Sequence, residues 1–208
     1  MQLIYNRTQS EPFNLSQDAR AYLCLGILWS GSQQHIAFNT VESMVQDIVP
    51  EIDGSLLCRK LYNEWGIWYA KNKHDKLAEE KFLTVIAHDR QQIPARTELG
   101  RLLSRQKGRE AEAEHFLREI LTIDPQNIQS RTELGRLLSR QKGREAEAEY
   151  FLREVLTIDP RNLHARTVLA KLYEKMNRIS DARKLYQELC EIDPGDRFGQ
   201  EGLARLKP

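Results

Sequence analysis

The chain has few of the residues that mark catalytic, metal-binding or disulfide-linked proteins. Its three cysteines, Cys24, Cys58 and Cys190, are odd in number, far apart and free of CxxC spacing, so neither a disulfide framework nor a zinc site is predicted. The five histidines are scattered without HExxH or paired spacing. A Walker loop, a GxSxG motif and a glycine-rich phosphate cradle after a strand are all missing from the sequence. We therefore expect no enzymatic activity, no metal and no cofactor.

Long apolar runs and an excess of charge of one sign are lacking as well. The most apolar run, Ala21 to Trp29, is far too short to cross a bilayer, and the first residues show no basic region followed by an apolar core. These features predict a cytoplasmic protein without a membrane segment. The 31 basic and 30 acidic residues argue against a generally cationic nucleic-acid binder, although net charge does not describe how the charges are arranged.

What the chain does contain is an internal repeat. The segment Arg96–Glu114 reappears letter for letter as Arg131–Glu149, thirty-five residues further on, and the similarity continues for another thirteen residues. A more diverged unit follows from Leu163 to Asp196. Self-similarity at such a period means that each unit is one supersecondary element whose apolar face is covered by its neighbours. Function is therefore expected on a surface rather than in a catalytic pocket.

Each unit is predicted to be two helices joined by short turns, because apolar and small residues follow helical spacing in two segments of every unit. Gly108 and Gly143 stand between these segments, where we expect a left-handed C′ residue that ends the first helix. An Asp-Pro step closes the second helix, and Asn127 and Asn162 are expected to cap the helices that follow.

The pattern of small residues resembles that of the tetratricopeptide repeat family, which places small residues at fixed positions in both helices and a proline near the end of the unit. The matching small residues are Gly100, Gly135 and Ala170 in the first helices and Ala113, Ala148 and Ala182 in the second helices. An upstream unit shows the same order in Trp65, Gly66, Tyr69, Ala78, Phe82 and Val85. The resemblance implies an all-α fold, a right-handed superhelical solenoid of antiparallel helix pairs, with a helical N-terminal segment and a C-terminal capping helix.

This resemblance divides the chain into a series of units. They are a loose N-terminal arm (1–14), a helical N-terminal segment (15–54), repeat 1 (55–92), repeat 2 (93–127), repeat 3 (128–162), repeat 4 (163–196) and a capping helix (197–208). Residues 15–54 are either a degenerate repeat or an unrelated helical pair. The two near-identical units carry one extra residue around the turn between their helices, so the surface there is less well defined than the fold.

In tetratricopeptide repeat proteins the first helix of each unit lines the concave surface, and here that face is predicted to carry a ladder of basic and polar residues. The predicted ligand-binding residues are Asn63, Lys71, Thr97, Arg101, Arg105, Thr132, Arg136, Arg140, Thr167, Lys171 and Lys175. The acidic residues that follow Gly108 and Gly143 belong to the second helices, so the charges are expected to be segregated. Arginine suits the capture of carboxylates because its planar fork makes two charge-assisted hydrogen bonds at once.

A competing interpretation is that these cations form ordinary ion pairs on the helix surface. Glu98 and Glu133 precede Arg101 and Arg136 by three positions, which is the spacing of such a pair. The diverged last unit nevertheless keeps the sign of charge, as lysine, at two of the ladder positions. Some family members bind C-terminal peptides through lysines and asparagines on this face; Asn63 matches one such position, whereas threonine and arginine stand at the others.

Three functions follow from this face. The first is a non-catalytic adaptor or scaffold that binds an acidic or C-terminal peptide segment of another protein in a basic concave groove. The second is binding of RNA or another polyanion by the same ladder, for which stacking aromatics are expected but scarce; the pentatricopeptide family, which reads single-stranded RNA, shares the thirty-five-residue period but not the Ile-Asp-Pro endings. The third is self-association through the ends of the solenoid.

Overall fold

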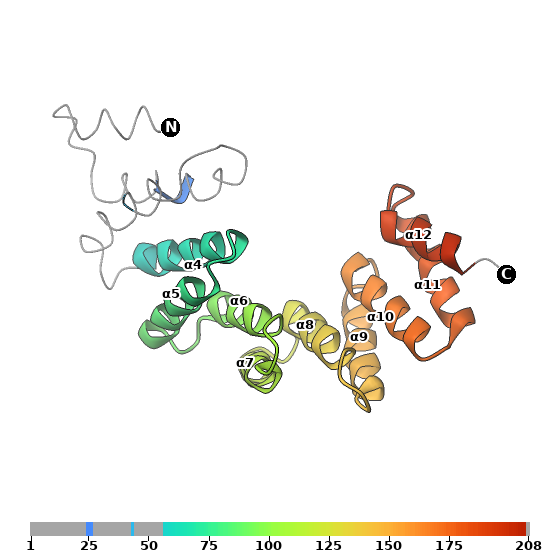
Figure 1. The fold of residues 1–208 in the computed structure, drawn as a ribbon, viewed down its shortest axis with the longest axis horizontal. Coiled ribbons are helices and arrows are strands. Elements are labelled where there is room, and N and C mark those ends of the chain that lie inside the picture. Colours follow the sequence, from blue (N-terminus) through green and yellow to red (C-terminus); the bar gives the residue numbers. More distant parts are fainter. Residues whose placement is uncertain (1–23, 27–42, 44–55, 207–208) are drawn as a thin grey trace. The chain divides into compact units, whose positions relative to one another are not determined.

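The computed structural model describes residues 24–26, 43 and 56–206, and all secondary structure within them is helical (Figure 1). From residue 56 onward the helices are α4 (Leu56–Lys71), α5 (Asp75–His88), α6 (Ile93–Leu103), α7 (Glu110–Ile123), α8 (Ile128–Leu138), α9 (Glu145–Ile158), α10 (Leu163–Lys175), α11 (Ile179–Ile192) and α12 (Arg197–Arg205). The chain divides into two compact units, residues 1–102 and 103–208. The expected arm 1–14 and nearly all of the expected helical segment 15–54 lie outside the described residues.

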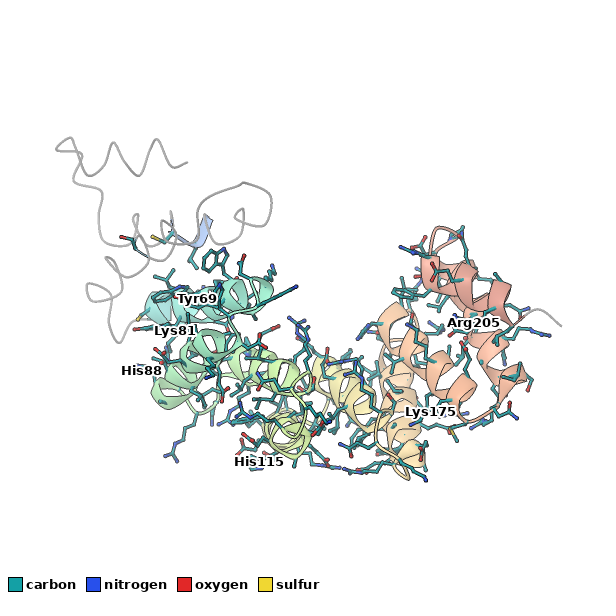
Figure 2. All side chains as sticks on the ribbon, viewed as in Figure 1. Tyr69, Lys81, His88, His115, Lys175 and Arg205 are labelled. Atoms are coloured by element: carbon teal, nitrogen blue, oxygen red, sulfur yellow. The ribbon has the colours of Figure 1, made fainter. Side chains whose placement is uncertain are left out.

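In the first unit, α4 and α5 form a helix pair around a buried aromatic core. Trp65 and Tyr69 on α4 and Phe82 on α5 are buried, and a Cβ placed on Gly66 would lie only 2.6 Å from the Phe82 ring. The small residue therefore lets the two helices approach closely, as the repeat pattern predicts. Lys81 covers this core from outside, with its Nζ 4.5 Å from the centroid of the Trp65 ring (Figure 2).

In the second unit, α8 pairs with α9 and α10 pairs with α11, while α7 packs on α8, α9 packs on α10 and α11 packs on α12. Each helix is thus covered by its neighbours along the chain, as expected of a helical repeat fold. The closest approach again occurs at small residues. A Cβ on Gly135 would lie 2.6 Å from Cγ of Leu152, and Ala148 and Ala170 are completely buried.

The turns between paired helices follow two designs. In the two near-identical units Gly108 and Gly143 take positive φ angles of 87° and 84°, whereas Lys73 and Asn177 take φ angles of 63° and 59° in the units without the extra residue. The left-handed glycines were predicted correctly, but the prediction that they end the first helix is wrong. Helix α8 ends at Leu138, and Gly143 directly precedes the N-cap of α9. The extra residue lengthens the turn, so the left-handed glycine lies just before the second helix instead of at the end of the first.

The predicted caps of the first helices are confirmed. The Oδ1 atoms of Asn127 and Asn162 each accept a hydrogen bond, 2.9 Å long, from the backbone N–H three residues further on. Asp196 caps α12 in the same way, at 2.6 Å. Each cap satisfies one of the backbone donors that a helix start leaves without a partner, which sharpens the boundaries between units.

The remaining predictions about the chain concern its thiols and its helices. Cys24 and Cys58 are buried, and Cys190 is half-buried. Among the helices of the described part of the chain, none has both the length and the apolarity that crossing a membrane requires.

Candidate functional site

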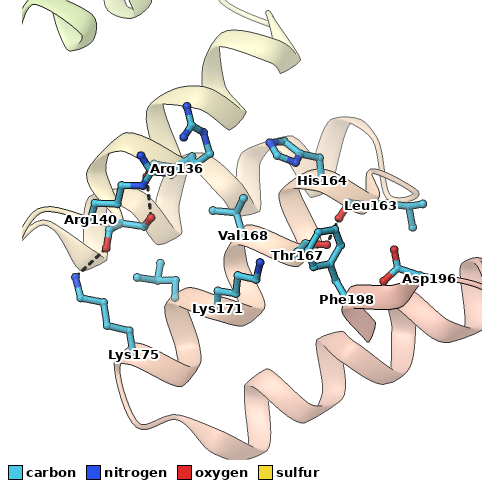
Figure 3. A pocket seen from close by; sticks show the side chains of 12 residues that line it. Arg136, Arg140, Leu163, His164, Thr167, Val168, Lys171, Lys175, Asp196 and Phe198 are labelled. Atoms are coloured by element: carbon cyan, nitrogen blue, oxygen red, sulfur yellow. Dashed lines mark hydrogen bonds between the residues drawn. The ribbon is translucent and has the colours of Figure 1, made fainter. Parts of the chain in front are cut away.

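A groove of about 560 Å³ lies between α8, α10 and the start of α12 in the second unit (Figure 3). Its basic residues are Arg136, Arg140, Lys171 and Lys175, and its apolar residues are Leu163, Val168, Leu172 and Phe198. Ser139, His164, Thr167 and Asp196 complete the lining. The groove therefore brings together five of the residues predicted from the sequence, including four of the predicted cations.

The three predicted threonines are turned toward their own helices. Thr97, Thr132 and Thr167 are 1%, 4% and 7% exposed. The Oγ1 atom of each donates to the carbonyl oxygen four residues earlier, at 2.9, 2.8 and 2.8 Å. Because each hydroxyl proton is used inside the helix, a threonine there offers a ligand a methyl group and acceptor lone pairs rather than a donor.

Two of the predicted arginines form the helix-surface pairs that the competing interpretation describes. Nη2 of Arg101 lies 2.5 Å from Oε2 of Glu98, and Nη2 of Arg136 lies 2.5 Å from Oε2 of Glu133. Arg136 also donates a hydrogen bond of 2.9 Å to Oγ of Ser104. The positive charge of Arg136 is thus held in place at the groove but is largely balanced.

Arg140 and Lys171 differ from these arginines, because neither has a carboxylate within 4.0 Å among the described residues. The pKa of the Arg140 guanidinium lies below its ordinary value, because neighbouring atoms partly desolvate it and the charges of Arg136 and Arg105 repel it. Nζ of Lys171 lies 4.4 Å from the centroid of the Phe198 ring. Both side chains are exposed, so they are open to an anion from outside the chain.

The other predicted residues lie in several places. Nζ of Lys175 donates to the Ser139 carbonyl at 2.8 Å. Arg105 lines a second depression of about 440 Å³, which Arg140 borders as well. Asn63, Lys71, Thr97 and Arg101 are residues of the first unit. There Lys71 is exposed at the end of α4, and Oδ1 of Asn63 is buried without a hydrogen-bond donor in the described structure.

Several arginines in or next to the second helices form ion pairs between neighbouring repeats. Glu114 of α7 accepts from Arg118 at 2.8 Å and from Arg144, next to α9, at 2.5 Å. Arg118 and Arg144 both bind Glu147 as well. The hydrogen bond from Arg144 is the main reason that the pKa of Glu114 lies below its ordinary value of 4.5. The ion pair between Arg144 and Glu114, which we call a clamp, has a counterpart one repeat later, where Arg178 pairs with Glu149 at 2.9 Å. These arginines link neighbouring repeats.

The sequence reasoning missed His164, Asp196 and Phe198, which the structure places at the groove. His164 follows the capping Asn162 by two positions and could have been found by extending the face of α10 to its first turn. Phe198 stood in a segment interpreted only as a cap. Its position depends on how α12 docks, for which a helical periodicity gives no signal.

Stacked helix pairs and an open groove define a helical repeat protein that offers a surface to a ligand. Models of the tetratricopeptide repeat match residues 93–127 and 139–206. The chain belongs to the tetratricopeptide repeat family. Proteins of this family generally serve as non-enzymatic scaffolds that bind other proteins.

Solved structures show the same fold. A thermophilic tetratricopeptide repeat protein from Thermus thermophilus is 18% identical, with a TM-score of 0.71 over 92% of this chain and 98% of that chain. A tetratricopeptide repeat protein from Parabacteroides merdae is 15% identical, with a TM-score of 0.74 over 91% and 72%. YrrB, described as having an unusual peptide-binding site, is 15% identical, with a TM-score of 0.61 over 85% and 87%. No curated protein matches the chain in sequence.

Proposed function

We propose that the chain is an adaptor that binds an acidic peptide segment of another protein, internal or C-terminal, in the groove between α8, α10 and α12. The observation that carries this proposal is the state of two groove cations. Arg140 and Lys171 have no carboxylate within 4.0 Å among the described residues, whereas Arg118 and Arg144 each bind two glutamates. An acidic ligand supplies the missing partners.

The charge balance of the groove favours an anion. Asp196 is the only acidic residue in the lining, and its Oδ1 is occupied by the cap of α12. Arg136 and Arg105 repel the Arg140 guanidinium, and the attraction of Glu133 offsets only part of this repulsion. A carboxylate placed beside Arg140 offsets this repulsion and accepts two hydrogen bonds from its planar guanidinium.

The groove is also organised before the ligand arrives. Arg136 and Lys171 stand on α8 and α10, and Arg140 lies in the turn that follows α8. The Arg136 side chain is already fixed by Glu133 and Ser104. Binding then orders little of the receptor, so more of the interaction free energy appears as affinity. A pre-formed groove of this kind suits an extended segment of a partner protein.

A matched pair of double charge reversals tests the proposal. Arg140→Glu with Lys171→Glu changes the groove, whereas Arg161→Glu with Lys184→Glu makes the same change in net charge at exposed residues outside it. The probe is a fluorescent glutamate-rich peptide with a free C-terminal carboxylate, followed by anisotropy. We expect the groove reversal to weaken binding by more than about tenfold, because it removes hydrogen bonds and installs repulsion, and the control to bind as the parent does. Equal binding by the parent and the groove reversal would refute the proposal.

Two further arms define the ligand. An amidated copy of the peptide measures the contribution of the terminal carboxylate, and an excess of polyuridine RNA competes as an unrelated polyanion. The groove holds only two flat rings, His164 and Phe198, so it offers little of the stacking that single-stranded RNA needs. We expect the RNA to leave the peptide bound; complete displacement would make polyanion binding the function instead.

A further inference from the structure

The groove has two chemically different ends. Arg140 and Lys175 lie toward one end, whereas Leu163 and Phe198 lie toward the other, where α12 begins (Figure 3). A peptide with acidic residues alone would use only the first end. The second end needs a ligand group of a different kind.

Phe198 is the reason that the second end is open to a ligand. Its side chain is 50% exposed, although it is one of the largest apolar groups in the second unit. The ring is not loose, because Nζ of Lys171 lies over it at 4.4 Å from the centroid. An apolar ligand side chain that covered this ring would remove apolar surface of both partners from water, which favours binding in proportion to the area removed.

The position of Phe198 is fixed by the docking of α12. A Cβ on Gly199 would lie 2.7 Å from Sγ of Cys190, and one on Gly202 would lie 2.6 Å from the Tyr186 ring, so the backbone of α12 is pressed against α11. At its far end, Arg205 pairs with Glu174 of α10 at 2.6 Å. Together with the Asp196 cap, these contacts hold the first turn of α12, and therefore Phe198, at the edge of the groove.

We infer that α12 is one wall of the binding site and that Phe198 selects a peptide with an apolar side chain next to its acidic residues. This inference rests on the proposed function and deepens it. The ligand is then an acidic segment with an aliphatic or aromatic anchor: its carboxylates bind at Arg140 and Lys171, and its anchor packs on Phe198. Helix α12 thereby becomes a specificity element.

Selection from a random peptide library tests both levels separately. The full chain is immobilised as the parent, as Phe198→Ala, and as Tyr150→Ala, a control at a side chain on α9 that is 56% exposed and outside the groove. We expect the parent and Tyr150→Ala to enrich peptides in which Asp or Glu adjoins Leu, Ile, Phe or Trp. Phe198→Ala should keep the acidic preference and lose the apolar one.

The outcomes distinguish the two claims. Acidic peptides without an apolar preference in the parent would overturn the inference and leave the proposed function standing. Apolar peptides without acidic residues would overturn the proposed function as well. An unchanged apolar preference in Phe198→Ala would show that another surface selects the anchor, and the inference would be wrong.

A double-mutant cycle on one selected peptide gives the quantitative test. We expect Phe198→Ala to weaken binding of the synthetic peptide about tenfold, equivalent to about 1.4 kcal/mol, and replacement of the anchor by alanine in the peptide to do the same. Both changes together should cost little more than either alone, because they remove the same contact. Losses that multiply would mean that Phe198 and the anchor do not meet, a result that a merely structural effect of Phe198→Ala would produce.

Discussion

The second unit contains two sets of cations with opposite circumstances. Arg118 lies on α7 and Arg144 is the N-cap of α9. Each binds one glutamate of its own repeat and one of the neighbouring repeat. Lys171 lies on α10 and Arg140 in the turn after α8, and neither has a carboxylate within 4.0 Å in the described structure. Basic residues therefore stabilise the contacts between repeats at one face and remain without a carboxylate at the other. Residue type alone does not separate the paired cations from the unpaired ones, but their contacts do.

The local sequence explains why these two groove cations lack partners. The positions three and four residues on either side of Arg140 hold Arg136, Leu137, Gly143 and Arg144, none of which is acidic. Lys171 does have an acid three residues on, Glu174, but Arg205 and the Tyr186 hydroxyl bind it. A helix-surface pair needs an acid at this spacing that is not already engaged, and neither cation has one.

The largest effect on stability is expected when the ion-pair network of Glu114 with Arg118 and Arg144 is broken. Glu114→Lys places a third cation beside Arg118 and Arg144 and should lower the free energy of unfolding by roughly 1–2 kcal/mol, since charged hydrogen bonds are lost from a partly exposed network. Urea unfolding followed by circular dichroism measures this change. Glu112→Lys is the matched control, because Glu112 is exposed and pairs with Arg109 alone; it should have the smaller effect. A larger loss for Glu112→Lys than for Glu114→Lys would contradict the assignment of Glu114 to a clamp between repeats.

Acid should weaken the same network. Hydrogen bonds from Arg144 keep the pKa of Glu114 in the folded chain below its ordinary value of 4.5. Burial opposes the shift at Glu147, but Arg118 and Arg144 outweigh it, so that the pKa of Glu147 is lowered too. Groups whose pKa is lowered by folding contribute stability that is fully present above the unfolded pKa and is lost as the pH falls through the folded pKa. Unfolding free energies measured from neutral pH to below 4.5 should therefore decline, and Glu114→Gln should decline less steeply. If the unfolding free energies of the parent and of Glu114→Gln declined equally with pH, Glu114 would not contribute to the acid sensitivity.

Salt should separate the two faces. Arg140 and Lys171 are exposed, so their attraction for an acidic peptide is screened when the Debye length falls from about 8 Å at 0.15 M to about 3 Å at 1 M ionic strength. We expect the affinity for the acidic probe to drop several-fold over this range, while the partly buried clamp keeps most of its contribution to stability. Anisotropy titrations and urea unfolding in the same buffers compare them, and a salt-independent affinity would count against electrostatic capture.

The smallest effect is expected when a groove cation is simply removed. Arg140→Ala should change the free energy of unfolding by no more than about 0.5 kcal/mol, the usual range for a surface position without a special role, and relief of repulsion from Arg136 gives a slight gain. Lys171→Ala should behave alike. A loss as large as that of Glu114→Lys would show that Arg140 has a structural partner and would erase the difference between the two faces.

Local patterns predicted much of the fold. The capping asparagines, the small residues at helix contacts and the Glu133–Arg136 pair all depend on residues a few positions apart, so periodicity reveals them. The ion pair between Arg144 and Glu114 joins residues thirty positions apart, yet it left a signal in the sequence, in the arginine that recurs at the N-cap of α7, α9 and α11. The aromatic end of the groove left none, because Phe198 reaches it only through the close approach of Gly199 to α11. The direction of the threonine hydroxyls was equally hidden, since a threonine on a helix face satisfies either its own backbone or a ligand.

The most direct test of the account is an amide NMR titration of the isotopically labelled chain with the glutamate-rich peptide. We predict saturable shifts of backbone signals in α8, in α10 and in the first turn of α12, with little change in α9 and α11, which do not line the groove. Shifts concentrated on α9 and α11 would contradict this prediction, because the ligand would then bind outside the groove.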